Sequence, residues 1–233
     1  MDYQQVVFPY QRSADRGGRT PRHPVVVVGA GPVGLALAID LALQQVPVVL
    51  LDNDDRLSTG SRAICFAKRT LEIFDRLGVG ANLVDKGVSW NTGRVFLRDQ
   101  PIYSFNLQPE TTHERPAFIN IQQYYVEGFL VERALELPLI DLRWKHAVVG
   151  VTQGHDAVTL QVQTPDGTVA LQAEHVIACD GARSSVRQLI GEEAKGRTFK
   201  DRFLIAECAS SARTRGTIRS GCFSASGSAS QPS

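Results

Sequence analysis

The sequence lacks several features that would assign it to a class at once. Its four cysteines, Cys65, Cys179, Cys208 and Cys222, form no CxxC pair, which argues against a disulfide framework or a zinc site. No apolar run approaches the roughly 18 residues of a membrane-spanning helix. The formal net charge is only +1, so no strong field favours nucleic acid or a membrane surface. Residues 1–23 lack the apolar centre of a secretory signal, and we expect a flexible leader on a cytoplasmic protein that binds no metal.

The N-terminal part instead contains a strand, a glycine turn, a helix and a second strand. Pro24–Val28 is a short apolar run rich in β-branched residues, typical of a strand buried on both faces. The glycine-rich stretch Gly29–Gly34 follows and leads into an apolar helix over Leu35–Gln45. Val46–Leu51 then predicts a second buried strand. This order predicts a right-handed crossover between two parallel strands.

The glycines of this turn have the spacing GxGxxG, which suits a dinucleotide. Gly29 allows a tight turn, Gly31 lets the backbone approach a pyrophosphate, and Gly34 lets the helix pack close to the strand. Asp52 ends the second strand, 18 residues beyond Gly34, where it can accept a hydrogen bond from a ribose hydroxyl. The unit by itself fits FAD and NAD equally well.

A second motif, Cys179-Asp180-Gly181, follows the predicted buried strand His175–Ala178. An acid at the end of such a strand lies where open parallel sheets bind ligands. Arg183 and Arg187 follow, and either could hold a phosphate or Asp180 itself. An ordinary turn without a ligand is an equally good interpretation of these residues alone.

The remaining chain is organised around further helices and strands. We expect helices over Arg69–Leu77 and Gln122–Leu137, a hairpin over Arg94–Asn106, and a three-stranded meander over Ala147–Thr152, Ala157–Thr164 and Thr168–Gln172. Residues 208–233 contain no Leu, Val, Lys, Asp or Glu, so we expect them to be disordered. Translation out of frame after about residue 207 would explain this tail, and a natural disordered tail is the alternative.

Taken together, Gly29–Gly34, Asp52 and the sequence CDGARSSVR resemble the fingerprints of the class A flavin-dependent aromatic hydroxylases. This family includes para-hydroxybenzoate hydroxylase, and the finer resemblance is to its 3-(3-hydroxyphenyl)propionate hydroxylase branch. The resemblance extends from about Val25 to Glu207. It implies an α/β fold, with a Rossmann-like FAD-binding domain that carries the β-meander and an incomplete substrate domain. The FAD-binding domain would comprise residues 24–207, with substrate-domain residues inserted at about 90–120.

The resemblance also implies which residues contact the cofactor. Arg62, in the segment Ser61-Arg62-Ala63, matches an arginine that contacts the flavin nucleotide, and Gln123, with Gln122 as the alternative, matches a glutamine that contacts FAD. By composition alone they would be a loop charge and a polar residue at a helix start. The full predicted set is Gly29, Gly31, Pro32, Val33, Gly34, Asp52, Asn53, Arg62, Gln123, Val148, Asp180, Gly181, Arg183 and Arg187.

The activity that the resemblance implies is hydroxylation of a small phenolic or aromatic substrate by O₂, with bound FAD and with NADPH or NADH as co-substrate. No catalytic residue is assigned. The family's third fingerprint, a Gly-Asp motif, does not occur in this sequence. We therefore expect the chain to hold the ADP half of FAD better than the ring half, and to show no detectable hydroxylation alone. The alternatives are a non-catalytic FAD-binding remnant and an NAD-dependent Rossmann oxidoreductase.

Overall fold

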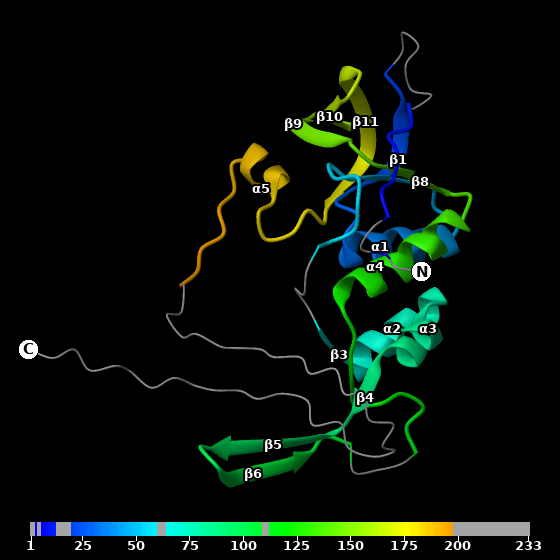
Figure 1. Cartoon of the computed structure of the whole chain (residues 1–233). Helices are drawn as coiled ribbons and strands as arrows, with labels where there is room; N and C mark the ends of the chain where they lie inside the picture. The colour runs from blue at the N-terminus through cyan, green and yellow to red at the C-terminus, as the bar shows by residue number, and fades with distance from the viewer. Residues whose placement is uncertain (1–2, 4–5, 13–19, 60–63, 109–111, 198–233) are drawn as a thin grey trace, which may run out of the picture. The chain divides into compact units, whose positions relative to one another are not determined.

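The computed structural model describes residues 3, 6–12, 20–59, 64–108 and 112–197 (Figure 1). These residues divide into two compact units. The larger unit includes the described residues up to Thr92 and from Asn106 to Glu193, and the smaller unit includes Gly93–Phe105 and residues 194–197.

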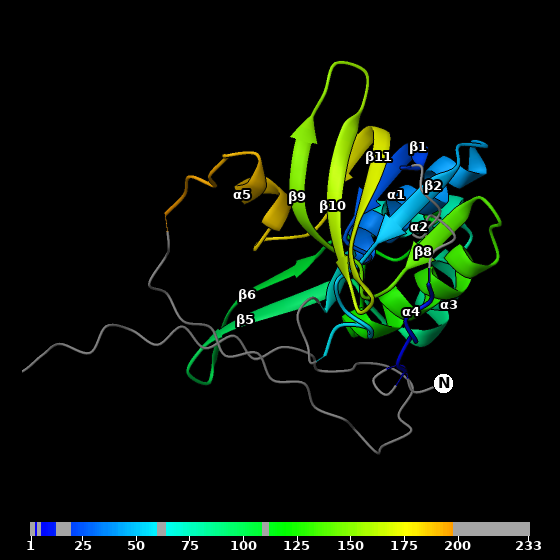
Figure 2. The same cartoon turned by 90° about the horizontal axis from the view of Figure 1, so that it is seen from above.

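A six-stranded sheet forms the centre of the larger unit, with the strand order β8-β2-β1-β11-β10-β9 (Figure 2). Four of its strands run parallel, and β11 pairs on its other side with an antiparallel meander. The strands are β1 (Arg22–Val28), β2 (Val48–Leu51), β8 (Ile140–Arg143), β9 (Ala147–Gln153), β10 (Val158–Thr164) and β11 (Gly167–Ala178). The predicted α/β fold with its Rossmann-like unit and meander is confirmed.

Helix α1 (Pro32–Leu43) makes the crossover from β1 to its parallel neighbour β2. The last four residues of β1 and all four of β2 are buried, as continuous apolar runs in parallel strands require. Because successive side chains of a strand point to opposite faces, these strands supply two separate hydrophobic clusters, one on each side of the sheet.

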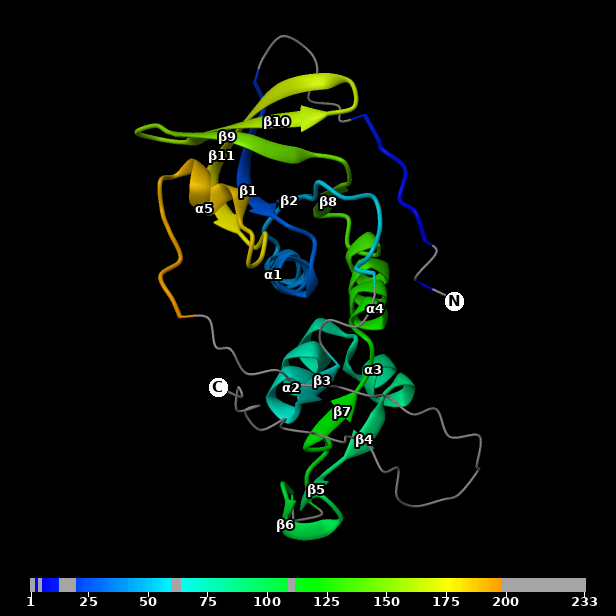
Figure 3. The same ribbon diagram turned by 60° about the vertical axis from the view of Figure 1, so that its left-hand side comes forward.

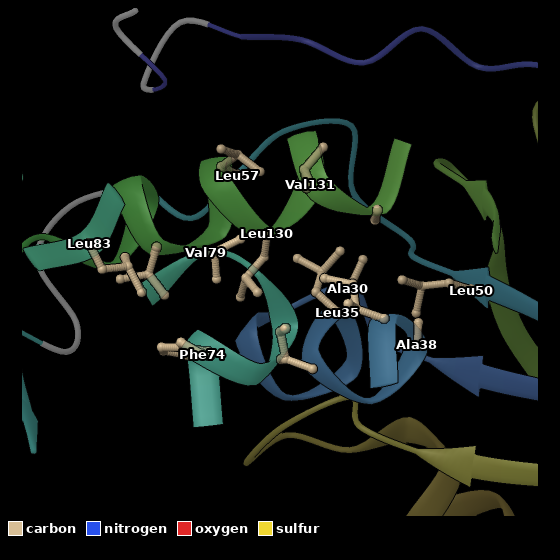
Figure 4. Close-up of a cluster of buried hydrophobic side chains, with 14 of the residues drawn as sticks. Ala30, Leu35, Ala38, Leu50, Leu57, Phe74, Val79, Leu83, Leu130 and Val131 are labelled. Carbon is tan, nitrogen blue, oxygen red and sulfur yellow. The ribbon is translucent and has the colours of Figure 1, made fainter. Parts of the chain in front are cut away.

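The first cluster joins the sheet to the helices. Val27 and Leu50 pack with Leu35 and Ala38 of α1 and with Leu130 of α4 (Gln123–Leu135). Figure 4 shows side chains from α1 and α4 meeting in this cluster. α2 (Lys68–Leu77) and α3 (Gly80–Lys86) extend it, next to a small sheet of order β3-β7-β4 that contains β3 (Cys65–Ala67), β4 (Val88–Trp90) and β7 (Phe118–Asn120).

The second cluster lies on the opposite face, where Val26 and Val49 pack with Leu160 of β10 and Leu171 of β11. Val186 of α5 (Ser185–Leu189) completes it. Figure 3 shows α5 beside the meander strand β9, against which it packs. The sheet is thus covered by helices on one face and by its own curled meander with α5 on the other.

The smaller unit contains the predicted hairpin, formed by β5 (Thr92–Leu97) and β6 (Gln100–Asn106). Apolar side chains on both strands are exposed, including 51% of Phe96, 66% of Leu97 and 61% of Ile102. A two-stranded ribbon with such exposure buries little apolar surface of its own.

One predicted pair of strands is a single strand. The sequence predicts a break between Thr168–Gln172 and His175–Ala178, but β11 runs unbroken from Gly167 to Ala178. Its first part pairs antiparallel with β10 up to Ala173, and its last part pairs parallel with β1 from Gln172. The exposed polar residue Glu174 lies where β11 leaves β10 for β1.

Part of the expected flexible leader packs against the domain. Tyr3 is only 7% exposed, and its hydroxyl donates to Glu132 on α4 over 2.6 Å. An ideal Cβ on Gly128 would lie 2.6 Å from the Tyr3 ring, which accounts for a glycine inside α4. Phe8 stacks on Trp144 with the ring centroids 4.5 Å apart. Aromatic burial of this kind offsets the entropy lost when a polar segment becomes ordered. The prediction of a flexible leader is therefore wrong for residues 3 and 6–12.

Two glycines of the turn are required by the packing of β1, α1 and β11. Gly29 has φ +104°, and an ideal Cβ there would lie 2.5 Å from the carbonyl oxygen of Cys179. A Cβ on Gly34 would overlap the carbonyl oxygen of Gly29. Because both obstacles are backbone atoms, neither can move aside as a side chain can.

We expect Gly34→Ala to lower the free energy of unfolding by more than ~2 kcal/mol, since the added methyl group must displace backbone at the end of β1. Urea denaturation followed by circular dichroism measures this change. The matched control is Gly31→Ala, because an ideal Cβ on Gly31 meets nothing within 4 Å. Equal stability losses in the two variants would contradict the packing described for Gly34.

Candidate functional site

The two glycine-containing motifs meet at the carboxyl ends of adjacent strands. β1 pairs with β11 so that Val28 lies beside Ala178, and the Cys179 amide donates to the Val28 carbonyl over 2.7 Å. From β1 the chain crosses by α1 to β2 on one side, whereas β11 lies on the other. The point where the strand order reverses in this way is where open α/β sheets bind ligands.

Gly31 differs from its neighbouring glycines because the protein itself does not require it. Its φ is −74°, which any residue adopts, and an ideal Cβ there would meet no atom within 4 Å. Gly31 is the N-cap of α1, no side chain caps this helix, and its first turn holds no acid. The free N–H groups and the partial positive charge of the helix start therefore face open space. A pyrophosphate fits there, where a side chain would obstruct it.

Two further predicted residues belong to the first turn of α1. Pro32 is at the first helical position, where its missing N–H leaves no donor unsatisfied. Val33 is 70% exposed, although it is apolar. Both lie directly beside the open space at Gly31.

Asp52 ties the end of β2 to the glycine turn. One carboxylate oxygen accepts from the Ala30 amide over 2.6 Å, and the other accepts from the Asp54 amide over 2.8 Å. Burial raises the pKa of Asp52, and the negative charge of Glu127 adds to the effect, against the lowering by the two amides. Each carboxylate oxygen has a second lone pair, so a ribose hydroxyl can still donate to it. Asn53 is exposed beside it.

Asp180 binds the start of the short helix α5, whose N-cap is Ser184 with its hydroxyl accepting from the Arg187 amide. Its carboxylate accepts from the Ser184 hydroxyl over 2.6 Å, from the Val186 amide over 3.0 Å and from the Ser185 hydroxyl over 3.2 Å. Burial opposes ionisation, but these hydrogen bonds outweigh it and lower the pKa of Asp180. Gly181 has φ +78°, a left-handed conformation that explains the glycine.

The two arginines after this turn do not bind Asp180. Among the described residues the carboxylate is held by serine hydroxyls and an amide instead. The Arg187 guanidinium donates to the Ala182 carbonyl over 2.8 Å, whereas Arg183 is exposed. The sequence allowed two partners for these arginines, Asp180 or a phosphate of a ligand. Asp180 is not their partner, and the phosphate stays a prediction.

The remaining predicted cofactor-binding residues lie outside the two glycine turns. Gln123 begins α4 and donates its Nε2 to Glu127 over 2.6 Å, and Gln122 is the N-cap of the same helix. Val148 is 6% exposed and packs in the second hydrophobic cluster. Arg62 lies outside the described residues.

Sequence reasoning missed Glu127, which is 3% exposed on α4. Its second carboxylate oxygen accepts from the Ser58 amide over 2.7 Å, in the segment that follows β2. Glu127 stands between Val126 and Leu130, which are buried positions of an apolar helix. An acid in such a place is rarely buried without a partner, so this position could have been recognised from the sequence. No group of three or more potential metal ligands occurs among the residues that the structure describes.

We expect Asp180→Asn to lower the free energy of unfolding by about 1–2 kcal/mol at pH 7, because the bonds that Asp180 accepts at the start of α5 are no longer charge-assisted. The pKa of Asp180 is lower in the folded protein than its usual value of 3.8. Its stabilisation is therefore complete above the unfolded pKa and is lost as the pH falls through the folded pKa. Urea denaturation of both proteins at pH 7 and pH 3 measures this. A stability difference that is the same at both pH values would argue against a stabilising role of the Asp180 charge.

Comparison with known proteins gives concordant matches. The family model described as "FAD binding domain" matches residues 22–218. A para-nitrophenol 4-monooxygenase of Pseudomonas sp. (strain WBC-3) is 33% identical over 185 residues, which are 77% of this chain and 45% of that protein. A 3-(3-hydroxy-phenyl)propionate/3-hydroxycinnamic acid hydroxylase of Burkholderia vietnamiensis (strain G4 / LMG 22486) is 30% identical over 204 residues, 83% of this chain and 35% of that protein.

The fold of this chain also matches that of a solved structure. The crystal structure of a p-nitrophenol 4-monooxygenase from Pseudomonas putida DLL-E4 superposes with a TM-score of 0.74 at 31% identity, over 79% of this chain and 47% of that one. The chain thus spans less than half the length of these relatives. The glycine turn, the Asp180 turn and the strands that hold them all lie within residues 22–218, and the chain belongs to the FAD binding domain family.

Proposed function

We propose that this chain binds the ADP half of FAD at the carboxyl ends of β1, β2 and β11, within an NADPH- or NADH-dependent monooxygenase that hydroxylates a small phenolic or aromatic substrate. The observation that carries the proposal is the open space at Gly31. A glycine that neither backbone conformation nor packing requires, in front of an uncapped helix start, is best explained by a ligand that needs the room.

The polar groups near this space have the chemistry of the rest of an ADP-ribose moiety. Asp52, held by the Ala30 amide, offers carboxylate lone pairs to a ribose hydroxyl. Gln123 lies on α4, whose Glu127 acts electrostatically on Asp52. Arg183 offers an exposed guanidinium for a phosphate. Asn53, Arg62, Val148, Gly181 and Arg187 complete the proposed set.

FAD supplies hydride acceptance from NAD(P)H and activation of O₂, while the protein binds and orients the cofactor. The names of the relatives support a phenolic substrate, since they include hydroxylases of nitrophenol and hydroxyphenylpropionate. Within the described residues, no helix has the length and apolarity that a membrane span requires. We place the protein in the cytoplasm, because Cys65 and Cys179 are free thiols and reduced thiols are typical there.

The domain organisation follows from the same reasoning. We propose an FAD-binding domain over residues 24–207 with part of a substrate domain inserted at about 90–120. The hairpin β5–β6 supports the insertion, because it forms part of a separate unit and exposes apolar side chains that a larger domain would cover. The expected tail, residues 208–233, lies outside the described residues, and the family match runs to residue 218.

We expect Gly31→Ala to weaken FAD binding at least about tenfold, about 1.4 kcal/mol, because its methyl group occupies the space proposed for the pyrophosphate. The same substitution should change the free energy of unfolding by no more than ~0.5 kcal/mol. Titration of FAD fluorescence against each purified protein measures the affinity.

The control for Gly31→Ala is Gly196→Ala, the same substitution at a glycine outside the proposed set, where an ideal Cβ also meets nothing within 4 Å. It should bind FAD within about threefold of the wild type. An unchanged affinity in Gly31→Ala would refute a pyrophosphate at this turn.

A further inference from the structure

Glu127 is a buried acid for which cofactor binding, as proposed so far, has no role. It lies on α4 and is 3% exposed. Its carboxylate accepts from two donors, the Ser58 amide over 2.7 Å and the Gln123 side-chain Nε2 over 2.6 Å. A buried carboxylate needs such partners, because removal from water without them is strongly unfavourable. An apolar residue at this position would need none, so the acid calls for another explanation.

The bond between Glu127 and Gln123 determines how the Gln123 amide is oriented. An ionised carboxylate only accepts hydrogen bonds, so the NH₂ group of Gln123 must point toward Glu127. The Oε1 atom of Gln123 then points away from Glu127, and it has no partner among the described residues. Without Glu127 either end of the amide could face that way, since the two ends are nearly equal in size.

The other donor to Glu127, the Ser58 amide, lies in the segment that follows Asp52. Ser58 follows β2 and Asp52 by a few residues, and its buried Oγ has no hydrogen-bond partner among the described residues. The negative charge of Glu127 contributes to the raised pKa of Asp52, so the two acids lie within electrostatic reach of each other. Glu127 therefore links α4 to the segment that follows the proposed ribose-binding acid.

We infer that Glu127 is a positioning residue of the cofactor site: it holds Gln123 so that this side chain presents a hydrogen-bond acceptor, Oε1, to a sugar hydroxyl of FAD. The inference rests on the proposed FAD site and adds a specificity element to it. Glu127 does not touch the ligand; it acts through Gln123. A hydroxyl donates well to such an acceptor, whereas a phosphate oxygen, itself an acceptor, is repelled.

The test exchanges the donor and acceptor ends of the pair. In Glu127→Gln the new amide oxygen still accepts from Ser58, so its NH₂ group faces the Gln123 NH₂ group. Gln123 must then turn over and present its NH₂ group to the ligand. We expect FAD to bind about tenfold more weakly, as when a hydrogen bond is replaced by two opposed donors.

The second variant restores the acceptor. In Glu127→Gln combined with Gln123→Glu, the carboxylate at position 123 accepts from the NH₂ group at position 127, and its other oxygen again faces the ligand. We expect its FAD affinity to return to within about threefold of the wild type. Urea denaturation separates this from a purely structural role, which predicts that FAD affinity falls only as far as the free energy of unfolding falls. An unchanged FAD affinity in the first variant, or no recovery in a double variant as stable as the wild type, overturns the inference.

A measurement without FAD separates this inference from the proposed function. In the wild-type chain the side-chain NH₂ protons of Gln123 should exchange with water at least about tenfold more slowly than those of Gln188, which is exposed on α5. Equal exchange rates would overturn the orientation of Gln123, whatever binds. Failure of the wild-type chain to bind FAD would instead count against the proposed function, while slow exchange would still support the role of Glu127. This measurement also serves if a substituted chain fails to fold.

Discussion

The close backbone packing where β1 ends determines the geometry of everything else at this site. Gly29 lies against the backbone of Cys179 and Asp180, and Gly34 of α1 lies against Gly29. Strand β1, the start of α1 and the end of β11 thus converge with backbone against backbone at Gly29, and the Cys179 side chain lies beside Gly34. The start of α1 and the Asp180 turn are consequently held at the same edge of the sheet, although they are far apart in the sequence.

The acids at the strand ends stabilise the backbone that forms the site. Asp52 joins the end of β2 to the glycine turn through the Ala30 amide, and Asp180 joins the end of β11 to the start of α5 through the Val186 amide. Glu127 joins α4 to the segment after β2. The start of α1 is the exception, because no side chain caps it and no acid lies in its first turn. An uncapped helix start of this kind is a favourable place for an anionic ligand.

Strong local patterns allowed the βαβ unit to be predicted from the sequence, whereas contacts between residues far apart in the sequence could not be predicted. The apolar runs of β1 and β2 and the glycines between them are local signals, and their predicted bounds lie within a few residues of the observed ones. The sequence did not predict that β11 is one unbroken strand. Its pairing partner changes from β10 to β1, and a local sequence pattern does not indicate which strands pair. Docking of Tyr3 on Gly128 was missed for the same reason, since it depends on a distant partner. The buried position of Glu127 had a local signal in α4, but its bond from the Ser58 amide also depends on a distant partner. Asp180 was predicted as a site residue, and its bonds to Ser184 and to the Val186 amide of α5 were not predicted, because a sequence does not show which groups a turn acid accepts from.

The central claim is that this chain is an FAD-binding unit, and the most direct test is the visible absorption spectrum of the purified chain. The chromophore is released by heat and identified by chromatography, and apoprotein is supplied with FAD and separately with NAD⁺. The account predicts a flavin spectrum, release of FAD, and uptake of FAD in preference to NAD⁺. A folded, colourless chain that takes up no FAD, or that binds NAD⁺ instead, would contradict it.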